Sequence, residues 1–189
     1  MATVLVPLAT GFEEIEAITV VDLLRRAGIE VVTAGLEPGP VRASRGVVVV
    51  PDALLEEVLE RSFDMIVLPG GLPGADHLEA DERVRTLLRR TADAGRYVAA
   101  ICAAPKVLAS SGLLAEHQAT AYPGVLDALA VPGMTYRPDL PVVRDGQVVT
   151  SRGPGTAMDF ALALVELLAG ADKRREVEAG LQRPAAAVA

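Results

Sequence analysis

The only cysteine of the chain, Cys102, stands where an apolar run meets the start of a helix. The preceding residues 97–101 (YVAAI) are typical of a buried parallel strand, and Pro105 fits the first helical turn, where its missing N–H costs nothing. A sharp strand-to-helix turn raises the thiol above the carboxyl edge of a sheet and aims free helix N–H groups at it. Such a position lowers the pKa of a thiol, so we expect a thiolate nucleophile. The alternative is a small buried hydrophobic residue, and the turn favours reactivity.

A carboxylate at Glu16 falls on the apolar side of the first predicted helix. With about 100° of rotation per residue, Glu16 projects into the middle of the apolar stripe. The stripe consists of Val20, Leu23, Leu24 and Ala27, whereas Glu14, Asp22 and Arg25 lie on the opposite side. A carboxylate in such a stripe is either buried with a partner or placed beside something reactive, and burial would raise its pKa. The alternative is an ordinary acid in the first turn of a helix, where negative charge is favourable.

The glycine-rich stretch 70–74 (GGLPG) follows another apolar run and could present backbone N–H groups as an anion or oxyanion site. It is not a phosphate-binding Walker A loop, because no Gly-Lys-Ser/Thr follows, and 153–155 (GPG) lacks the third glycine of a dinucleotide fingerprint. Lys106 could support a thiolate, but a solvated surface lysine is the favoured interpretation. His77 and His117 are expected in loops, and the spacing does not connect either to Cys102.

The elements that must position these residues alternate along the chain. Strands are expected at 4–7, 29–34, 65–68, 97–101 and 119–122, helices at 13–27, 54–60, 81–94, 105–111, 156–168 and 172–181, and hairpins at 41–50 and 142–150. Asp52 is expected to cap the helix at 54–60 and Asp81 to open the helix at 81–94. This order predicts an open α/β sandwich, a mostly parallel sheet with helices on both faces. Ligands bind at the carboxyl ends of the strands in such folds.

Composition narrows the functional classes. With 189 residues, 51% of them hydrophobic, the chain can form one domain, expected at 1–183, with a frayed tail at 184–189. The net charge of −7 argues against nucleic acid or anionic membranes as partners. One cysteine excludes an internal disulfide, and one cysteine with two histidines gives no spaced metal-ligand cluster. No basic region precedes the first apolar run, so we expect a soluble, cytoplasmic protein. Because the metal-ligand and nucleotide-binding patterns are missing, we expect no metal or nucleotide cofactor.

Four motifs in order resemble the DJ-one/ThiJ/PfpI superfamily, in the branch of the Parkinson-associated protein and its bacterial relatives. They are 11–16 (GFEEIE), 68–71 (LPGG), 100–105 (AICAAP) and 150–156 (TSRGPGT). The resemblance covers the chain from the first strand to about residue 181 and implies a flavodoxin-like sandwich that forms a homodimer.

The resemblance also implies roles for single residues. Cys102 would be the nucleophile and redox-sensitive thiol, and Glu16 would share a proton with it. Gly71 and Ala103 would offer backbone N–H groups to an oxyanion. The pocket would include Gly70, Pro154 and Tyr122, with Arg26 and Arg45 near it across the dimer interface, where they would attract small anions.

Two positions depart from the family pattern. The protease and amidase-like branches have a histidine directly after the cysteine, where this chain has Ala103, so a Cys-His proteolytic pair is not expected. Some close relatives have a histidine where this chain has Tyr122, so chemistry that needs that imidazole should be absent or altered.

The resemblance therefore implies a cofactor-free glyoxalase or deglycase that acts on glyoxal, methylglyoxal or their protein adducts. The rival interpretation is a redox-sensing, chaperone-like stress protein in which Cys102 is oxidised to a sulfinate. A cysteine protease or amidase is the least favoured interpretation.

Overall fold

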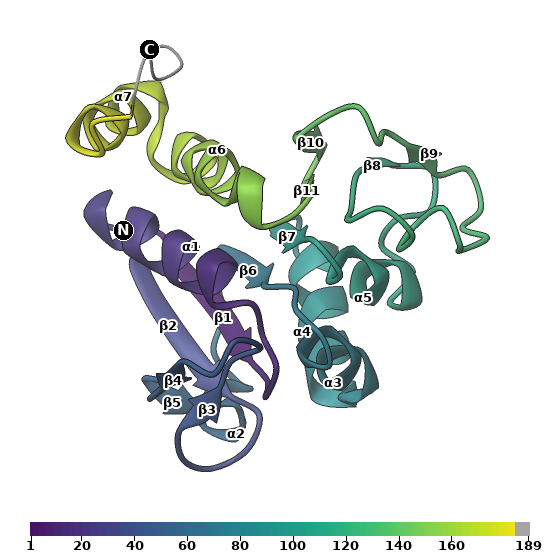
Figure 1. Cartoon of the computed structure of the whole chain (residues 1–189), viewed down its shortest axis with the longest axis horizontal. Helices are drawn as coiled ribbons and strands as arrows, with labels where there is room; N and C mark the ends of the chain where they lie inside the picture. Colours follow the sequence, from purple (N-terminus) through teal and green to yellow (C-terminus); the bar gives the residue numbers. More distant parts are fainter. Residues whose placement is uncertain (184–189) are drawn as a thin grey trace.

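The computed structural model describes residues 1–183, and within them one central sheet runs through the molecule (Figure 1). Its strand order is β10-β11-β7-β6-β1-β2-β5. The bounds are β1 (Thr3–Leu8), β2 (Glu30–Gly35), β5 (Ala53–Leu54), β6 (Met65–Leu68), β7 (Tyr97–Ile101), β10 (Val142–Asp145) and β11 (Val148–Ser151). All neighbours pair in parallel except β10 and β11. The mostly parallel sheet predicted from the sequence is confirmed.

Helices cover both faces of this sheet, because its strands are apolar on both sides. In β1, Val4 and Val6 belong to one apolar core and Leu5, between them, belongs to the other. The first core is covered by α1 (Glu14–Arg26), α6 (Ala157–Ala169) and α7 (Ala171–Gly180). The second is covered by α2 (Leu55–Val58), α3 (Gly74–Ala80), α4 (Glu82–Asp93) and α5 (Pro105–Ser110). The fold is therefore a three-layer α/β sandwich, as the sequence predicts.

The chain reverses its direction of travel across the sheet at β1. β2 and then β5 lie on one side of β1, and β6, the strand that follows β5 in the chain, lies on the other side. Where the strand order reverses in this way, a crevice forms at the carboxyl ends of the strands. Ligands bind in this crevice in open α/β folds. The segments after β1, β6 and β7 meet at this edge.

The end of the chain holds a long apolar helical stretch, Pro154–Gly180, which by length and composition alone could cross a membrane. The stretch is divided, because Gly170 has a φ of 87° and separates α6 from α7. The apolar face of α6 is buried in the core through Phe160, Leu164 and Val165. We interpret it as a core helix.

Some local predictions are wrong. Asp52 does not cap α2, because its carboxylate accepts hydrogen bonds from the backbone and hydroxyl of Thr33 and pairs with Arg25. The sequence does not predict helix α3, which carries His77, a residue expected in a loop. Residues 119–122 do not form a strand of the main sheet, because β8 (Gln118–Ala119) ends earlier and pairs only with β9 (Thr135–Tyr136).

The two predicted hairpins take different places. The hairpin at 142–150 forms the antiparallel edge of the main sheet as β10 and β11. The hairpin at 41–50 forms a separate two-stranded sheet, β3 (Val41–Arg42) with β4 (Val48–Val49). Asp81 opens α4 as predicted, since its side chain accepts from the backbone N–H of Arg83 at 2.9 Å. The predicted tail at 184–189 lies outside the described residues.

Candidate active site

Cys102 occupies the predicted turn between β7 and α5 in a strained conformation. Its φ is 64°, in the left-handed region that costs a non-glycine residue roughly 1–2 kcal/mol. Two neighbouring segments hold it there: its N–H donates to the carbonyl of Ser151 and its carbonyl accepts from the N–H of Tyr122, both at 2.9 Å. The turn is therefore a nucleophile elbow fixed from both sides, which presents the thiol at the carboxyl edge of the sheet.

Glu16 reaches the same place from the first turn of α1 and is completely buried. One carboxyl oxygen, Oε2, accepts from the backbone N–H of Gly70 at 2.7 Å. The other, Oε1, has no hydrogen-bond partner among the described residues, and the neighbouring Cys102 thiol is the side chain able to supply one. Burial raises the pKa of Glu16 from 4.5 to about 7, against the hydrogen bonds from Gly70 and Cys102. The buried position predicted from helical phase is confirmed.

The expected low pKa of the thiol is not found. Burial, followed by the negative charge of Glu16, raises the pKa of Cys102 to about 12, while backbone N–H groups of Gly71 and Ala103 act in the opposite direction. Helix α5 has only six residues, so its dipole is too weak to outweigh burial. Burial thus disfavours the charged form of both groups, and a charge on Glu16 further disfavours a thiolate at Cys102. A thiolate therefore requires that Glu16 take the proton.

Glycines make this close approach possible. A Cβ atom on Gly70 would lie 2.7 Å from Cys102 Cβ and 2.8 Å from Glu16 Oε2, so no side chain fits between the two reactive groups. Gly71 has a φ of 85°, and a Cβ there would collide with the backbone of Phe12 and Glu13. The glycine-rich segment after β6 is thus locked against the start of α1, and it directs the Gly71 N–H at the sulfur.

The mouth of the site is bounded by Tyr122 and by the turn that follows β11. Tyr122 is half exposed, and Pro154 begins a short 3₁₀ turn, Pro154–Thr156. Gly153 was not singled out from the sequence, yet a Cβ there would lie 3.3 Å from the Tyr122 ring and 4.0 Å from Cys102 Sγ. Its place inside the motif 150–156 is the sequence signal that could have identified Gly153 as a residue of the site. Gly153 leaves the sulfur open between Tyr122 and this turn.

The basic residues and histidines are spread more widely. Arg26 pairs with Asp22 at the opposite end of α1 from Glu16, so within one chain it does not join the site. Arg45 lies at the hairpin that contacts the start of α1, where its N–H donates to Glu14 at 2.9 Å. Their predicted place across a dimer interface remains a prediction.

Lys106 pairs with Asp76 and Glu79 on α3 and does not support the thiolate. His117 lies beside Asp145, and His77 beside Thr10.

No three metal-ligating side chains gather anywhere in residues 1–183. The functional groups at the site are one sulfur, one carboxyl group and backbone N–H groups. This set suits addition of a thiolate to a carbonyl, since the N–H groups can hold the resulting oxyanion and the carboxyl group can move a proton.

Fold and site together define a flavodoxin-like sandwich with a cysteine at a nucleophile elbow and a buried glutamic acid beside it. The comparisons with known proteins agree: residues 2–167 match the model of the DJ-1/PfpI family, and the chain belongs to this family.

Its relatives match nearly the whole chain. Drosophila melanogaster protein dj-1beta is 48% identical over 178 residues, 94% of this chain and 95% of that protein. The crystal structure of Drosophila melanogaster DJ-1beta superposes with a TM-score of 0.93 at 45% identity, covering 97% of this chain and 98% of that one. A structure described as oxidized Toxoplasma gondii DJ-1 gives a TM-score of 0.89 at 39% identity, covering 96% and 98%. A Caenorhabditis elegans relative named glutathione-independent glyoxalase DJR-1.2 is 41% identical over 161 residues, 85% of each chain.

Proposed function

We propose that this protein is a cofactor-free enzyme that converts small dicarbonyls, such as glyoxal and methylglyoxal, to 2-hydroxy acids. The observation that carries the proposal is the buried pair of Glu16 and Cys102, in which burial raises the pKa of the carboxyl group to about 7, so that it can take up and release a proton near neutral pH. The relative named as a glutathione-independent glyoxalase supports the choice of substrate class.

The reaction begins when Glu16 takes the thiol proton and the Cys102 sulfur forms a bond to the aldehyde carbon of methylglyoxal. The carbonyl electron pair moves to oxygen, and the N–H groups of Gly71 and Ala103, which act on the thiol by lowering its pKa, stabilise that oxyanion. Protonated Glu16 then returns its proton to the oxyanion, which gives a neutral hemithioacetal.

The second half moves hydrogen between adjacent carbons. The Glu16 carboxylate removes the proton from the former aldehyde carbon, giving an enediolate, and returns it to the neighbouring carbon while the hydroxyl proton moves from the first oxygen to the second. The product is a 2-hydroxy thioester on Cys102, and water cleaves it to lactate and the free thiol. The net reaction adds one water to methylglyoxal, so no oxidant or reductant is consumed. A carboxyl group with a pKa of about 7 suits both proton transfers.

The deglycase form of this activity would begin with an adduct of methylglyoxal with a protein amine, guanidine or thiol, which releases the free protein group and the aldehyde, and Cys102 would then attack that aldehyde. The half-exposed Tyr122 at the mouth leaves the sulfur within reach from outside. Ala103 in place of a histidine argues against proteolysis, because no imidazole follows the nucleophile.

Redox sensing is the second candidate, and the structure described as oxidized Toxoplasma gondii DJ-1 favours its inclusion. A sulfinate on Cys102 would accept a charge-assisted hydrogen bond from protonated Glu16 and further bonds from Gly71 and Ala103. The site that holds an oxyanion during catalysis therefore suits an oxidised sulfur as well.

A turnover assay on the reduced and oxidised protein separates the two functions. The enzyme proposal predicts lactate from methylglyoxal without glutathione, and loss of lactate after mild peroxide, because a sulfinate cannot attack a carbonyl. No turnover by the reduced protein, together with partner binding that appears only after oxidation, would favour the sensor instead.

We further propose that the protein works as a homodimer. The outer face of α1 and the hairpin beside it expose the apolar side chains Ile15, Ile18, Val47, Val48 and Val50. A second copy would cover these side chains and bring the partner's basic groups toward the start of α1.

A further inference from the structure

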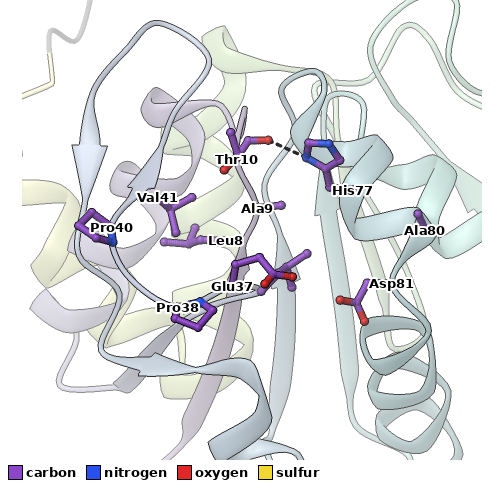
Figure 2. A pocket seen from close by; sticks show the side chains of 11 residues that line it. Leu8, Ala9, Thr10, Glu37, Pro38, Pro40, Val41, His77, Ala80 and Asp81 are labelled. Atoms are coloured by element: carbon purple, nitrogen blue, oxygen red, sulfur yellow. Dashed lines mark hydrogen bonds between the residues drawn. The ribbon is translucent and has the colours of Figure 1, made fainter.

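A cavity of about 410 Å³ lies at the carboxyl ends of β1 and β2, between the loop 36–41 and α3 (Figure 2). Its volume falls within the roughly 300–1,000 Å³ that is typical of small-ligand pockets. None of the residues that line it belongs to the Cys102 site. We propose that it binds a small organic cation, an ammonium group carried on an apolar carbon skeleton.

The inner part of the cavity is apolar. Leu8, Leu36 and Val41 line it, and each of these side chains is otherwise buried in one of the two cores. Ala9, which is also buried, completes this surface between them. Hydrocarbon placed here leaves water without displacing a polar group, which stabilises the complex by about 25 cal/mol for each Å² of apolar surface covered.

The rim carries negative charge that the chain does not neutralise. Glu37 and Asp81 line the cavity and no lysine or arginine does, and in Figure 2 the two carboxylates point toward each other across it. Asp81 is already paired with Arg83 at 2.6 Å. Glu37 makes no hydrogen bond or ion pair with the part of the chain that the structure describes. The uncompensated charge is therefore that of Glu37, and it favours a cation.

The remaining polar groups also accept hydrogen bonds. His77 Nδ1 lies 3.0 Å from the carbonyl oxygen of Thr10, and because that oxygen can only accept, Nδ1 must donate. In the neutral ring this leaves Nε2 as an acceptor. An ammonium group has three donors and no acceptor, so it complements Glu37 and the neutral ring of His77, whereas a carboxylate or phosphate would find only the Thr10 hydroxyl as a donor among the lining side chains.

The cavity is separated from the Cys102 site by the contact between residues 11–13 and the glycine-rich segment 70–74. Binding here does not need the thiol, so the proposal stands apart from the proposed catalytic function. The variant Cys102→Ala should bind the cation as the unmodified protein does.

The test is an NMR titration of the labelled full-length protein with phenethylammonium, 2-phenylethanol and 3-phenylpropanoate, which carry the same ring with positive, neutral and negative heads. Phenethylammonium should shift the amide signals of residues 9–10, 36, 37, 39, 41 and 77–81, and it should bind more tightly than the alcohol. The propanoate should leave these signals unmoved. Equal binding of the anion, or shifts confined to other residues, would overturn the proposal.

Two variants and a control sharpen the result. Glu37→Gln, in an exposed loop, should weaken phenethylammonium binding roughly fivefold, the upper end for a solvent-exposed ion pair. Ala80→Phe, at an exposed position on the lining, should abolish binding by filling the cavity. Asp93→Asn removes a carboxylate from the exposed end of α4 and should leave binding unchanged. Unchanged affinity in Glu37→Gln, or an equal loss in Asp93→Asn, would contradict the assignment.

Discussion

Replacing Glu16 with glutamine should stabilise the folded protein at neutral and alkaline pH. The glutamine oxygen can still accept from the Gly70 N–H, and its NH₂ can donate to the Cys102 sulfur. The variant therefore keeps both contacts and loses only the buried charge. The pKa of Glu16 rises from 4.5 to about 7 on burial, which corresponds to roughly 3 kcal/mol of folding free energy.

The direction of this pH dependence follows from the protonation state of Glu16 that the folded protein favours. A raised pKa means that folding favours the protonated carboxyl group, so its contribution is present below pH 4.5 and is lost as the pH rises through about 7. The unmodified protein should lose roughly 3 kcal/mol between about pH 4.5 and pH 8 that the variant does not lose. At pH 8 the variant should thus be the more stable protein.

Urea unfolding followed by circular dichroism across this pH range measures the effect. Asp93→Asn is the matched control, because it removes a carboxylate that is exposed to solvent. It should follow the unmodified protein at every pH. If Glu16→Gln and the unmodified protein have the same pH dependence, Glu16 is not a buried acid and its role as a proton carrier must be abandoned.

Other perturbations address the chemistry and the assembly. Glu16→Gln should lower methylglyoxal turnover by about 100- to 10,000-fold in a lactate assay, because the glutamine amide cannot take up and release a proton. Unchanged turnover would exclude Glu16 as the general acid and base. Gly70→Ala should lower both the melting temperature and turnover, because the new Cβ would lie 2.7 Å from Cys102 Cβ; a fully active and equally stable variant would show that the spacing is not needed. Val48→Asp, on the exposed hairpin, should convert a dimer to monomers in sedimentation velocity experiments, and an unmodified protein that is already monomeric at micromolar concentration would refute the dimer.

The sequence predicts the positions of Cys102 and Glu16, because both positions depend on local patterns. Pro105 after an apolar run indicates an elbow at Cys102, and the helical phase of Glu16 places it in the apolar stripe of α1. The pKa of the thiol could not be predicted in the same way. Its value depends on burial and on the charge of Glu16, and these come from segments far apart in the chain.

The other wrong predictions also concern features that depend on contacts between segments far apart in the chain. Asp52 has the local pattern of a helix cap, but Thr33 on the neighbouring strand and Arg25 on α1 offer it better partners. Helix α3 begins at Gly74 within a stretch typical of a loop, and it is held by the bond from the Ala75 N–H to the Gly71 carbonyl at 2.8 Å. The cation cavity combines residues 8–10, 36–41 and 77–81, and no pattern in the sequence connects these segments.

The most direct test of the proposed function is the rate at which the reduced protein forms lactate from methylglyoxal, without glutathione, compared with that of Cys102→Ser. Serine keeps the size and the elbow but replaces the nucleophilic sulfur with a hydroxyl group. The proposed mechanism predicts steady lactate production by the unmodified protein and none above background by the variant. Equal rates in the two proteins, or no lactate from either, would contradict it.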